Sequence, residues 1–117
     1  MMLYNSQTVE TITGEVVSVD RIAPMKGMSY GVHVKVKTAT ETIPVHLGPA
    51  WFLDPQETHI LKGDKVTVIG SRVDYQGKPA IIAAEVKKGE DTFRLRDENG
   101  FPAWSGWRRQ QMQMKQP

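Results

Sequence analysis

The chain has 117 residues, 39% of them hydrophobic, which is enough for one compact domain and too few for two ordinary ones. Its 15 Lys and Arg residues nearly balance 13 Asp and Glu residues, and both signs are mixed along the chain, which argues against a polybasic binder. The sequence contains no cysteine, which excludes disulfides, thiolate metal sites, iron–sulfur clusters, covalent haem attachment and cysteine nucleophiles.

Membrane and export signals are also missing from the sequence. No run approaches the roughly 18 apolar residues of a membrane-spanning helix. The first residues, MMLYNSQTVE, have neither the basic start nor the apolar run of a signal peptide. We therefore predict no membrane span and no signal peptide in this chain, and it remains open that the chain is the mature part of an exported precursor.

The dominant hydrophobic period is two, which predicts short strands rather than helices. The first strand is expected from about Val9 to Ile22. From Ile12 to Val16 the apolar residues occupy even positions, and from Val17 to Val19 they occupy odd positions, so the buried face of the strand changes there. We therefore expect a bulge or a sharp coil near Gly14.

The second and third strands are expected over Val32–Lys37 and Thr42–Leu47, each with alternating apolar residues. Apolar residues face one another in the register Val36–Ile43, Val34–Val45 and Val32–Leu47. In this register His33 lies directly opposite His46, whereas a slip of two residues would separate them. Pro44 has no backbone N–H to donate to a neighbouring strand, so it should lie on the unpaired side of the third strand. If that side is an open edge, a strand of a partner protein could pair with it.

A short helix is expected after Pro49, followed by strands over Lys65–Val73 and Ala80–Lys87 and by a hairpin that turns at Asn99-Gly100. These elements predict an all-β fold, a five-stranded OB-like barrel with a short helix between strands three and four and an added C-terminal β-hairpin. A β-sandwich is the alternative. We expect a single domain over residues 1–107 and a basic, flexible tail over residues 108–117.

The segments "YGVH", "VHLGPAW", "KGDKVTVIGS" and "LRDENGFPAWSGWRR" carry a resemblance to a known family. The chain resembles small, mostly exported bacterial OB-like proteins, similar to the domain found in magnetosome-associated proteins. The resemblance implies a periplasmic or envelope setting and, in some relatives, proximity to redox or metal-handling proteins. Some relatives carry haem-attachment cysteines, and because this chain has none, a cytochrome role does not transfer to it.

The opposed histidines are a candidate metal site. Cross-strand Cβ atoms lie about 4.5–5.5 Å apart, close enough for His33 and His46 to share one transition metal. Met25 and Met28 precede them, and thioether with imidazole suits Cu(I). The alternative is that the histidines are polar positions on a half-exposed sheet and that the methionines pack at the barrel mouth.

An OB-fold binds through the face of strands two and three and the adjoining loops. The candidate ligand-binding residues on this face are Lys26, Tyr30, His33, Lys35, Lys37, His46, Arg72, Tyr75 and Lys78. Single-stranded nucleic acid is one ligand class, but no Phe, Tyr or Trp occupies an outward position of strands two and three to stack on bases.

Catalytic motifs are not found in the sequence. It has no nucleophile elbow, phosphate-binding glycine loop, HExxH helix or spaced carboxylate pair. Trp51, Phe52, Trp104 and Trp107 are expected to cap the barrel. We therefore expect a non-catalytic binding or interaction module of the cell envelope, with a metal or a protein as partner. The alternative is a single-stranded nucleic-acid-binding protein.

Overall fold

A computed structural model describes residues 4–23 and 30–105 of the chain. The predicted tail over residues 108–117 and the candidate residues Met25, Lys26 and Met28 lie outside the described residues. In the part that is described, no helix is long and apolar enough to cross a membrane.

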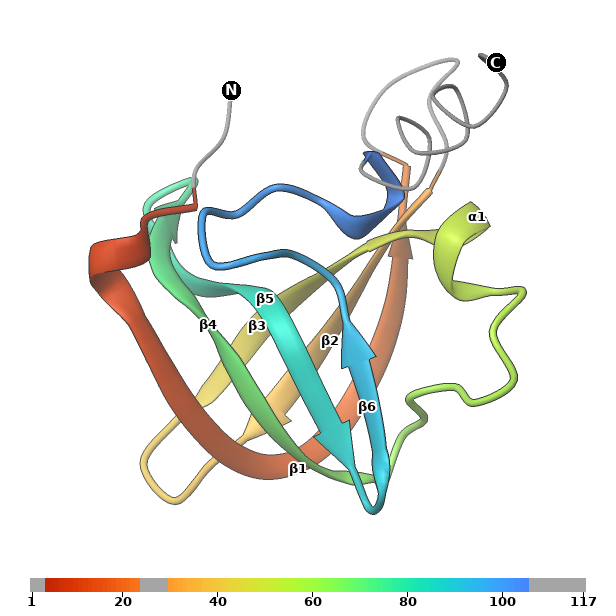
Figure 1. The fold of residues 1–117 in the computed structure, drawn as a ribbon. Helices are drawn as coiled ribbons and strands as arrows, with labels where there is room; N and C mark the ends of the chain where they lie inside the picture. Colours follow the sequence, from red (N-terminus) through yellow and green to blue (C-terminus); the bar gives the residue numbers. More distant parts are fainter. Residues whose placement is uncertain (1–3, 24–29, 106–117) are drawn as a thin grey trace, which may run out of the picture.

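The fold is the predicted all-β barrel (Figure 1). The elements in chain order are the 3-10 turn η1 (Ser6–Thr8), β1 (Val9–Ile22), β2 (Gly31–Lys37), β3 (Thr42–Pro49), α1 (Ala50–Leu53), β4 (Lys65–Tyr75), β5 (Lys78–Lys88) and β6 (Asp91–Arg94). The sheet order is β3-β2-β1-β4-β5-β6, and a parallel pairing of β3 with β5 closes the first five strands into a ring. The five-stranded OB-like barrel with a short helix between strands three and four is therefore confirmed.

The first strand is long and strongly coiled because it serves two neighbours. Val9–Glu15 pairs with β4 and Glu15–Ile22 pairs with β2. Where β1 changes its partner from β4 to β2, a Cβ atom on Gly14 would overlap the carbonyl oxygen of Lys37. Only glycine therefore permits the close approach of β1 and β2 at this point. The coil is near Gly14 as expected, and the bulge follows at Val17, between Val16 and Ser18.

The β2–β3 register is confirmed over most of its length. Val36 pairs with Ile43, Val34 with Val45 and His33 with His46. The predicted pair Val32–Leu47 is wrong, because a bulge after His46 places Gly48 opposite Val32. Gly48 is covered by the indole of Trp104, which lies 2.8 Å from the position of a Cβ atom there, so a larger residue would not fit.

The barrel closes along a short ladder. β3 and β5 are joined only at Val45–Ile81 and His46–Ile82. Next to this ladder the guanidinium of Arg96 donates to the carbonyl oxygens of Leu47 at 3.2 Å and of Ala83 at 2.6 Å, and it lies over the ring of Trp104 at 5.2 Å. Arg96 thus links the two closing strands through their backbones.

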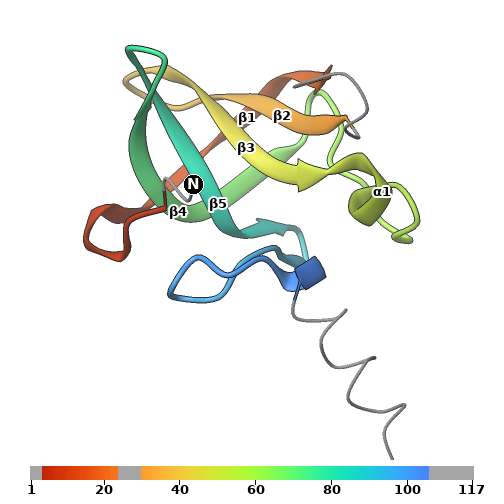
Figure 2. The ribbon, with the colours of Figure 1, turned by 90° about the horizontal axis from the view of Figure 1, so that it is seen from above.

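The segment from β6 to residue 105 packs on the outside of the ring of five strands (Figure 2). β6 pairs with β5, and a turn through Asn99 and Gly100 brings Pro102 back to a single bridge with Arg96. The predicted hairpin is therefore reduced to this bridge. Trp104 then packs on Phe52 with ring centroids 5.2 Å apart, so the expected capping role holds for these two aromatic residues.

Gly14→Ala should lower the free energy of unfolding by about 2–4 kcal/mol, because the added methyl group forces β1 away from β2. Gly31→Ala is the matched control: it is also a strand glycine, and the nearest atom to its Cβ position is 3.8 Å away. That control should cost less than about 1 kcal/mol. Urea denaturation of both variants measures the difference, and equal losses would contradict this role of Gly14.

Arg96→Met should lower the free energy of unfolding by about 2–4 kcal/mol, since it removes the donor shared by the closing strands from a partly buried position. Arg94→Met is the control, because the Arg94 side chain is 79% exposed and its ion pair with Glu85 is long, at 3.8 Å. An exposed pair of this kind contributes less than about 0.5 kcal/mol. Similar denaturation midpoints for the two variants would count against a closing role for Arg96.

Candidate functional site

The two histidines form a stacked pair on the outer face of β2 and β3. Their ring centroids lie 3.8 Å apart and the ring planes differ by 5°. The stack follows directly from the register, because His33 and His46 are opposite each other and both alternate with buried valines.

Tyr75 joins the histidine pair from the end of β4. Its ring meets the ring of His46 edge-on, with centroids 4.8 Å apart and planes at 86°. The β4–β5 turn explains its position: Gln76 and Gly77 have φ values of 54° and 81°, as a two-residue type I′ hairpin requires. Barrel closure then brings this hairpin end beside β3.

These rings line a groove with a volume of about 540 Å³, which we name the histidine groove. Its walls come from β1, β2, β3 and the β4–β5 hairpin. The lining residues are Asp20, Ile22, His33, Lys35, Pro44, His46, Tyr75, Gln76, Lys78, Pro79 and Ala80. The structure therefore brings together five candidate residues predicted from the sequence: His33, Lys35, His46, Tyr75 and Lys78.

The polar groups of the histidine groove have few partners. Within the described part of the chain, the side chains of Lys35, Gln76 and Lys78 and the ring nitrogens of both histidines make no hydrogen bond or ion pair, while Asp20 accepts one hydrogen bond from Ser18 at 3.2 Å. Some charged side chains elsewhere are paired, as in Arg21–Asp54 and Lys88–Asp64, whereas others, such as Lys37 and Lys65, also have no partner among the described residues. The groove thus presents unused donors and acceptors to a ligand.

Burial keeps both imidazoles neutral at pH 7. Desolvation lowers the pKa of His46 to about 4, and the neighbouring charges of His33 and Arg96 act in the same direction. Desolvation also lowers the pKa of His33, an effect that Asp20 partly opposes. Neutral imidazoles stack without repulsion and keep a lone pair free.

The pair as it stands does not direct its lone pairs at a single ion. Imidazole lone pairs lie in the ring plane, and these planes are parallel and stacked 3.8 Å apart. At least one ring would have to rotate for both nitrogens to reach a metal at about 2.0–2.1 Å. Among the described residues, no group of three or more His, Asp or Glu side chains is arranged to hold a metal ion.

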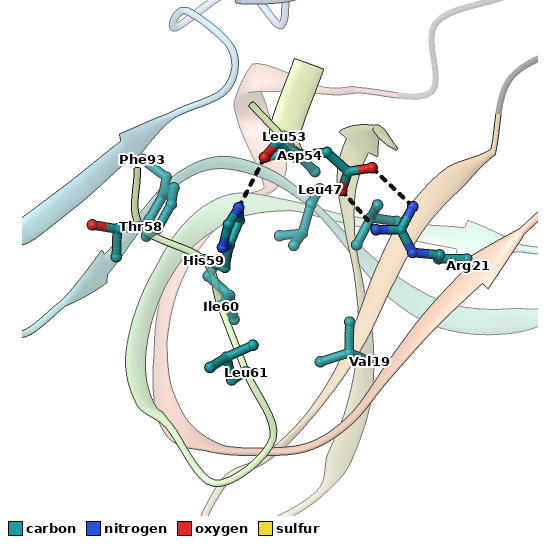
Figure 3. Close-up of a pocket in the computed structure, with 11 residues that line it drawn as sticks. Val19, Arg21, Leu47, Leu53, Asp54, Thr58, His59, Ile60, Leu61 and Phe93 are labelled. Carbon is teal, nitrogen blue, oxygen red and sulfur yellow. Dashed lines mark hydrogen bonds and ion pairs between the residues drawn. The ribbon is translucent and has the colours of Figure 1, made fainter. Parts of the chain in front are cut away.

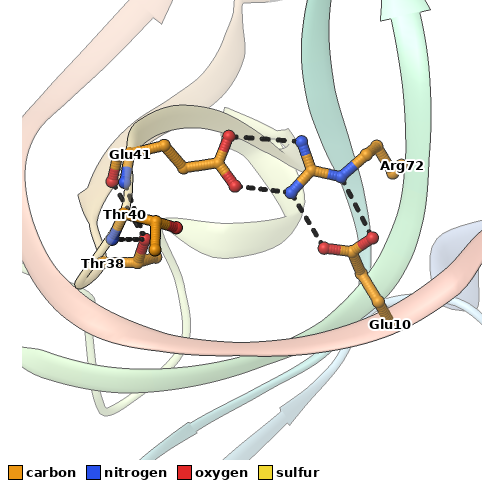
Figure 4. Close-up of polar contacts among 5 residues, drawn as sticks. All are labelled: Glu10, Thr38, Thr40, Glu41 and Arg72. Carbon is orange, nitrogen blue, oxygen red and sulfur yellow. Dashed lines mark hydrogen bonds and ion pairs between the residues drawn. The ribbon is translucent and has the colours of Figure 1, made fainter.

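Arg72 is held in an ion-pair network outside the histidine groove (Figure 4). Its guanidinium binds Glu10 at 2.9 Å and Glu41 at 2.6 Å, and this pairing raises the pKa of Arg72. The network ties the start of β1 and the β2–β3 turn to β4. Its contacts are structural, and they leave Arg72 little capacity to bind a ligand.

The remaining candidates lie elsewhere. Tyr30 and Lys37 are exposed and do not line the groove. His59 is a separate histidine, whose Nε2 lies 2.9 Å from the carbonyl oxygen of Asp54. Sequence reasoning did not identify Asp20 as a groove residue, whereas β1 pairs Asp20 with His33 and the structure places it in the groove. The bulge at Val17 reverses which residues of β1 face inward, so that even-numbered residues such as Asp20 face outward after it. This change in the apolar alternation is the signal in the sequence that identifies Asp20.

The chain matches a protein-family model over the strands of the barrel. The family model described as "MamS/MamX magnetosome protein family" matches residues 8–93, which include β1 to β5 and every residue of the histidine groove. No curated protein matches the chain.

Stability should fall as the pH decreases from about 6.5 to about 4. Both histidines have lowered pKa values in the folded state, so the unfolded chain takes up protons first and the folded state is disfavoured in this window. We expect a loss of about 2 kcal/mol or less, because the groove is partly open to water. His46→Phe should reduce this loss, and His59→Phe should leave it unchanged. Urea midpoints at pH 7 and pH 4.5 test this; identical pH dependence in all three proteins would contradict it.

Proposed function

The chain belongs to the MamS/MamX magnetosome protein family, and on this premise we propose that it is a non-catalytic binding module of the bacterial cell envelope whose ligand occupies the histidine groove. The observation that carries the proposal is the set of unpartnered polar and aromatic side chains gathered in one groove. Unpaired donors and acceptors gain free energy when a ligand supplies their partners. The groove volume of about 540 Å³ lies within the usual range of binding pockets.

A segment of a partner protein is the ligand that suits this lining best. The groove alternates apolar surfaces from Ile22, Pro44 and Pro79 with the amide of Gln76 and the ammonium of Lys78. Such mixed, aromatic-rich surfaces are typical of protein interfaces. Pro44 and Pro79 have no backbone N–H, so the partner would bind through side-chain contacts more than through an added strand. The surplus of Lys35 and Lys78 over Asp20 favours an acidic segment.

A transition metal is a second ligand class for the same groove. The observation in its favour is that both imidazoles are neutral and have free ring nitrogens, so that no proton needs to be displaced at pH 7. With two histidine ligands and rotation of a ring, further ligands would have to come from water or from a partner. The metal would then reinforce the same binding role.

Single-stranded nucleic acid is the alternative function. Tyr75 supports it, because the barrel closure adds this aromatic ring to a face on which the strands themselves offer none. The pairing of Arg72 with two carboxylates weakens it, since a phosphate-binding cation is lost. Nucleic-acid affinity would fall steeply as the salt concentration rises.

Site-specific photocrosslinking in the bacterial host tests the proposal. Replacing Tyr75 by p-benzoylphenylalanine puts a photoreactive ring in the groove, and the same replacement of Tyr30 is the matched control, since Tyr30 is 53% exposed and lies outside the groove. We expect discrete protein adducts from position 75 only, reduced several-fold when His33→Ala is added, because that change removes part of the groove lining.

The other outcomes separate the candidates. Adducts from position 75 that disappear on nuclease treatment would support the nucleic-acid alternative. A loss of the protein adducts on chelation, restored by added Zn²⁺, would show that a metal contributes. The same adducts from positions 30 and 75, or none from position 75, would contradict the proposed function.

A further inference from the structure

A second pocket lies on the opposite side of the β1–β2 ribbon from the histidine groove (Figure 3). Side chains alternate along each strand, so Asp20 and His33 face the groove while Val19, Arg21 and Val32 face this pocket. The two sites have no lining residue in common. We name this second site the aliphatic pocket.

The wall of the aliphatic pocket is mainly aliphatic, and its volume is about 400 Å³. The apolar lining comes from β1, β2, β3, α1, the loop before β4, and β6. These residues are Val19, Val32, Leu47, Leu53, Ile60, Leu61 and Phe93. An apolar pocket offers water few hydrogen bonds, so replacing water there by an apolar group is favourable.

Of the four polar residues that line the pocket, Arg21, Asp54 and His59 satisfy one another at the rim, whereas the side chain of Thr58 makes no hydrogen bond within the described part of the chain. Arg21 binds both carboxylate oxygens of Asp54, at 3.1 and 2.6 Å, and Nε2 of His59 contacts the carbonyl oxygen of Asp54 at 2.9 Å (Figure 3). A ligand that buried a polar group in the pocket would therefore find few partners there. The body of the ligand must be apolar, and its polar end must stay at the rim.

Apolar side chains also reach the mouth of the pocket. Val19 is 41% exposed and Leu61 is 58% exposed, and both line the pocket. A bound chain would cover them and remove further apolar surface from water. The N–H of Leu61 donates to the carboxylate of Asp64 at 2.7 Å, and Asp64 pairs with Lys88 at 2.9 Å, so the loop bearing Leu61 is held in place at the rim. The Arg21–Asp54 pair beside it is exposed and therefore weak.

From these features we propose that the aliphatic pocket binds the alkyl chain of a small amphiphile, with the head group in water beside Arg21. The pocket exceeds the volume of any single side chain, so an anchor residue from a protein partner would leave an unfilled cavity, which is unfavourable. The apolar part of the lining has one aromatic ring, that of Phe93, and otherwise branched aliphatic groups, which suits a flexible chain better than a flat ring system.

The test uses sodium decanoate as the probe and sodium butyrate as its short-chain control, both below the concentration at which decanoate forms micelles. Methyl NMR of the full chain follows Val32, Leu47 and Ile60 in the pocket. Decanoate should shift these methyl signals saturably with a stoichiometry of one, and butyrate should bind at least tenfold more weakly. Equal binding of both would show a carboxylate site at Arg21 and overturn the proposal, as would the lack of a saturable decanoate shift.

A variant that blocks the mouth of the aliphatic pocket tests whether decanoate binds there. Val19→Phe should fill the mouth and weaken decanoate binding at least tenfold, whereas Val9→Phe, in the same strand and 40% exposed, should leave it unchanged. Equal effects of the two variants would overturn the assignment to this pocket.

Vesicles of phosphatidylglycerol and phosphatidylethanolamine provide a second arm of the test. Shifts of the pocket methyl signals with vesicles as well as with decanoate identify a membrane lipid as a source of the chain, and shifts with decanoate alone identify a free amphiphile. Crosslinking from Tyr75 reports on the histidine groove separately, so each proposal can fail without the other.

Discussion

The closure of β3 onto β5 is the constraint on which the rest of this structure depends. An open five-stranded sheet would leave two unpaired edges, and the barrel removes them with a parallel ladder of only two residue pairs. Arg96 extends this junction by donating to carbonyls on both strands. Burial without a carboxylate partner in the described structure lowers the pKa of Arg96 to about 10, but it remains charged at neutral pH and keeps its donors.

The same closure builds the histidine groove. The cross-strand histidines come from neighbouring strands, but Tyr75 and Lys78 are close to them only because the β4–β5 hairpin end is brought beside β3. Trp104 covers Gly48, which lies two residues after His46 in β3. Arg96 lies near enough to His46 to help lower the pKa of that histidine. The stability of the barrel and the shape of the groove are thus coupled at one junction, since a loosened closure would also separate the walls of the groove.

Ion pairs hold several charged side chains outside the groove, whereas the charged side chains that line it form none within the described structure. Arg21, Arg72 and Lys88 all have carboxylate partners, and those pairs hold loops and strand ends in place. In the groove, neutral stacked imidazoles, a tyrosine edge and two lysines have no such partners in the described structure. The β1–β2 ribbon separates this polar groove from an aliphatic pocket on its other side, because the period of a strand sends successive side chains to opposite faces. A single ribbon therefore lines two sites of different chemistry.

The sequence by itself determined the strands, the inward faces of β2 and β3, and the family. Period-two alternation of apolar against polar residues is local information, and it excludes a slip by one residue, which would bury the lysines. It does not exclude a slip by two residues, so the structure decided the pairing of His33 with His46. Tertiary structure alone decided the bulge after His46, which makes Gly48 rather than Leu47 the partner of Val32. The indole that requires a glycine at position 48 belongs to Trp104, far away in the sequence. It also decided that Arg72 pairs with Glu10 and Glu41, that Asp20 and Gln76 enter the groove, and that Arg96 closes the barrel. These contacts join residues far apart in the chain, and their partners depend on how a coiled first strand curves the sheet, which no local pattern encodes.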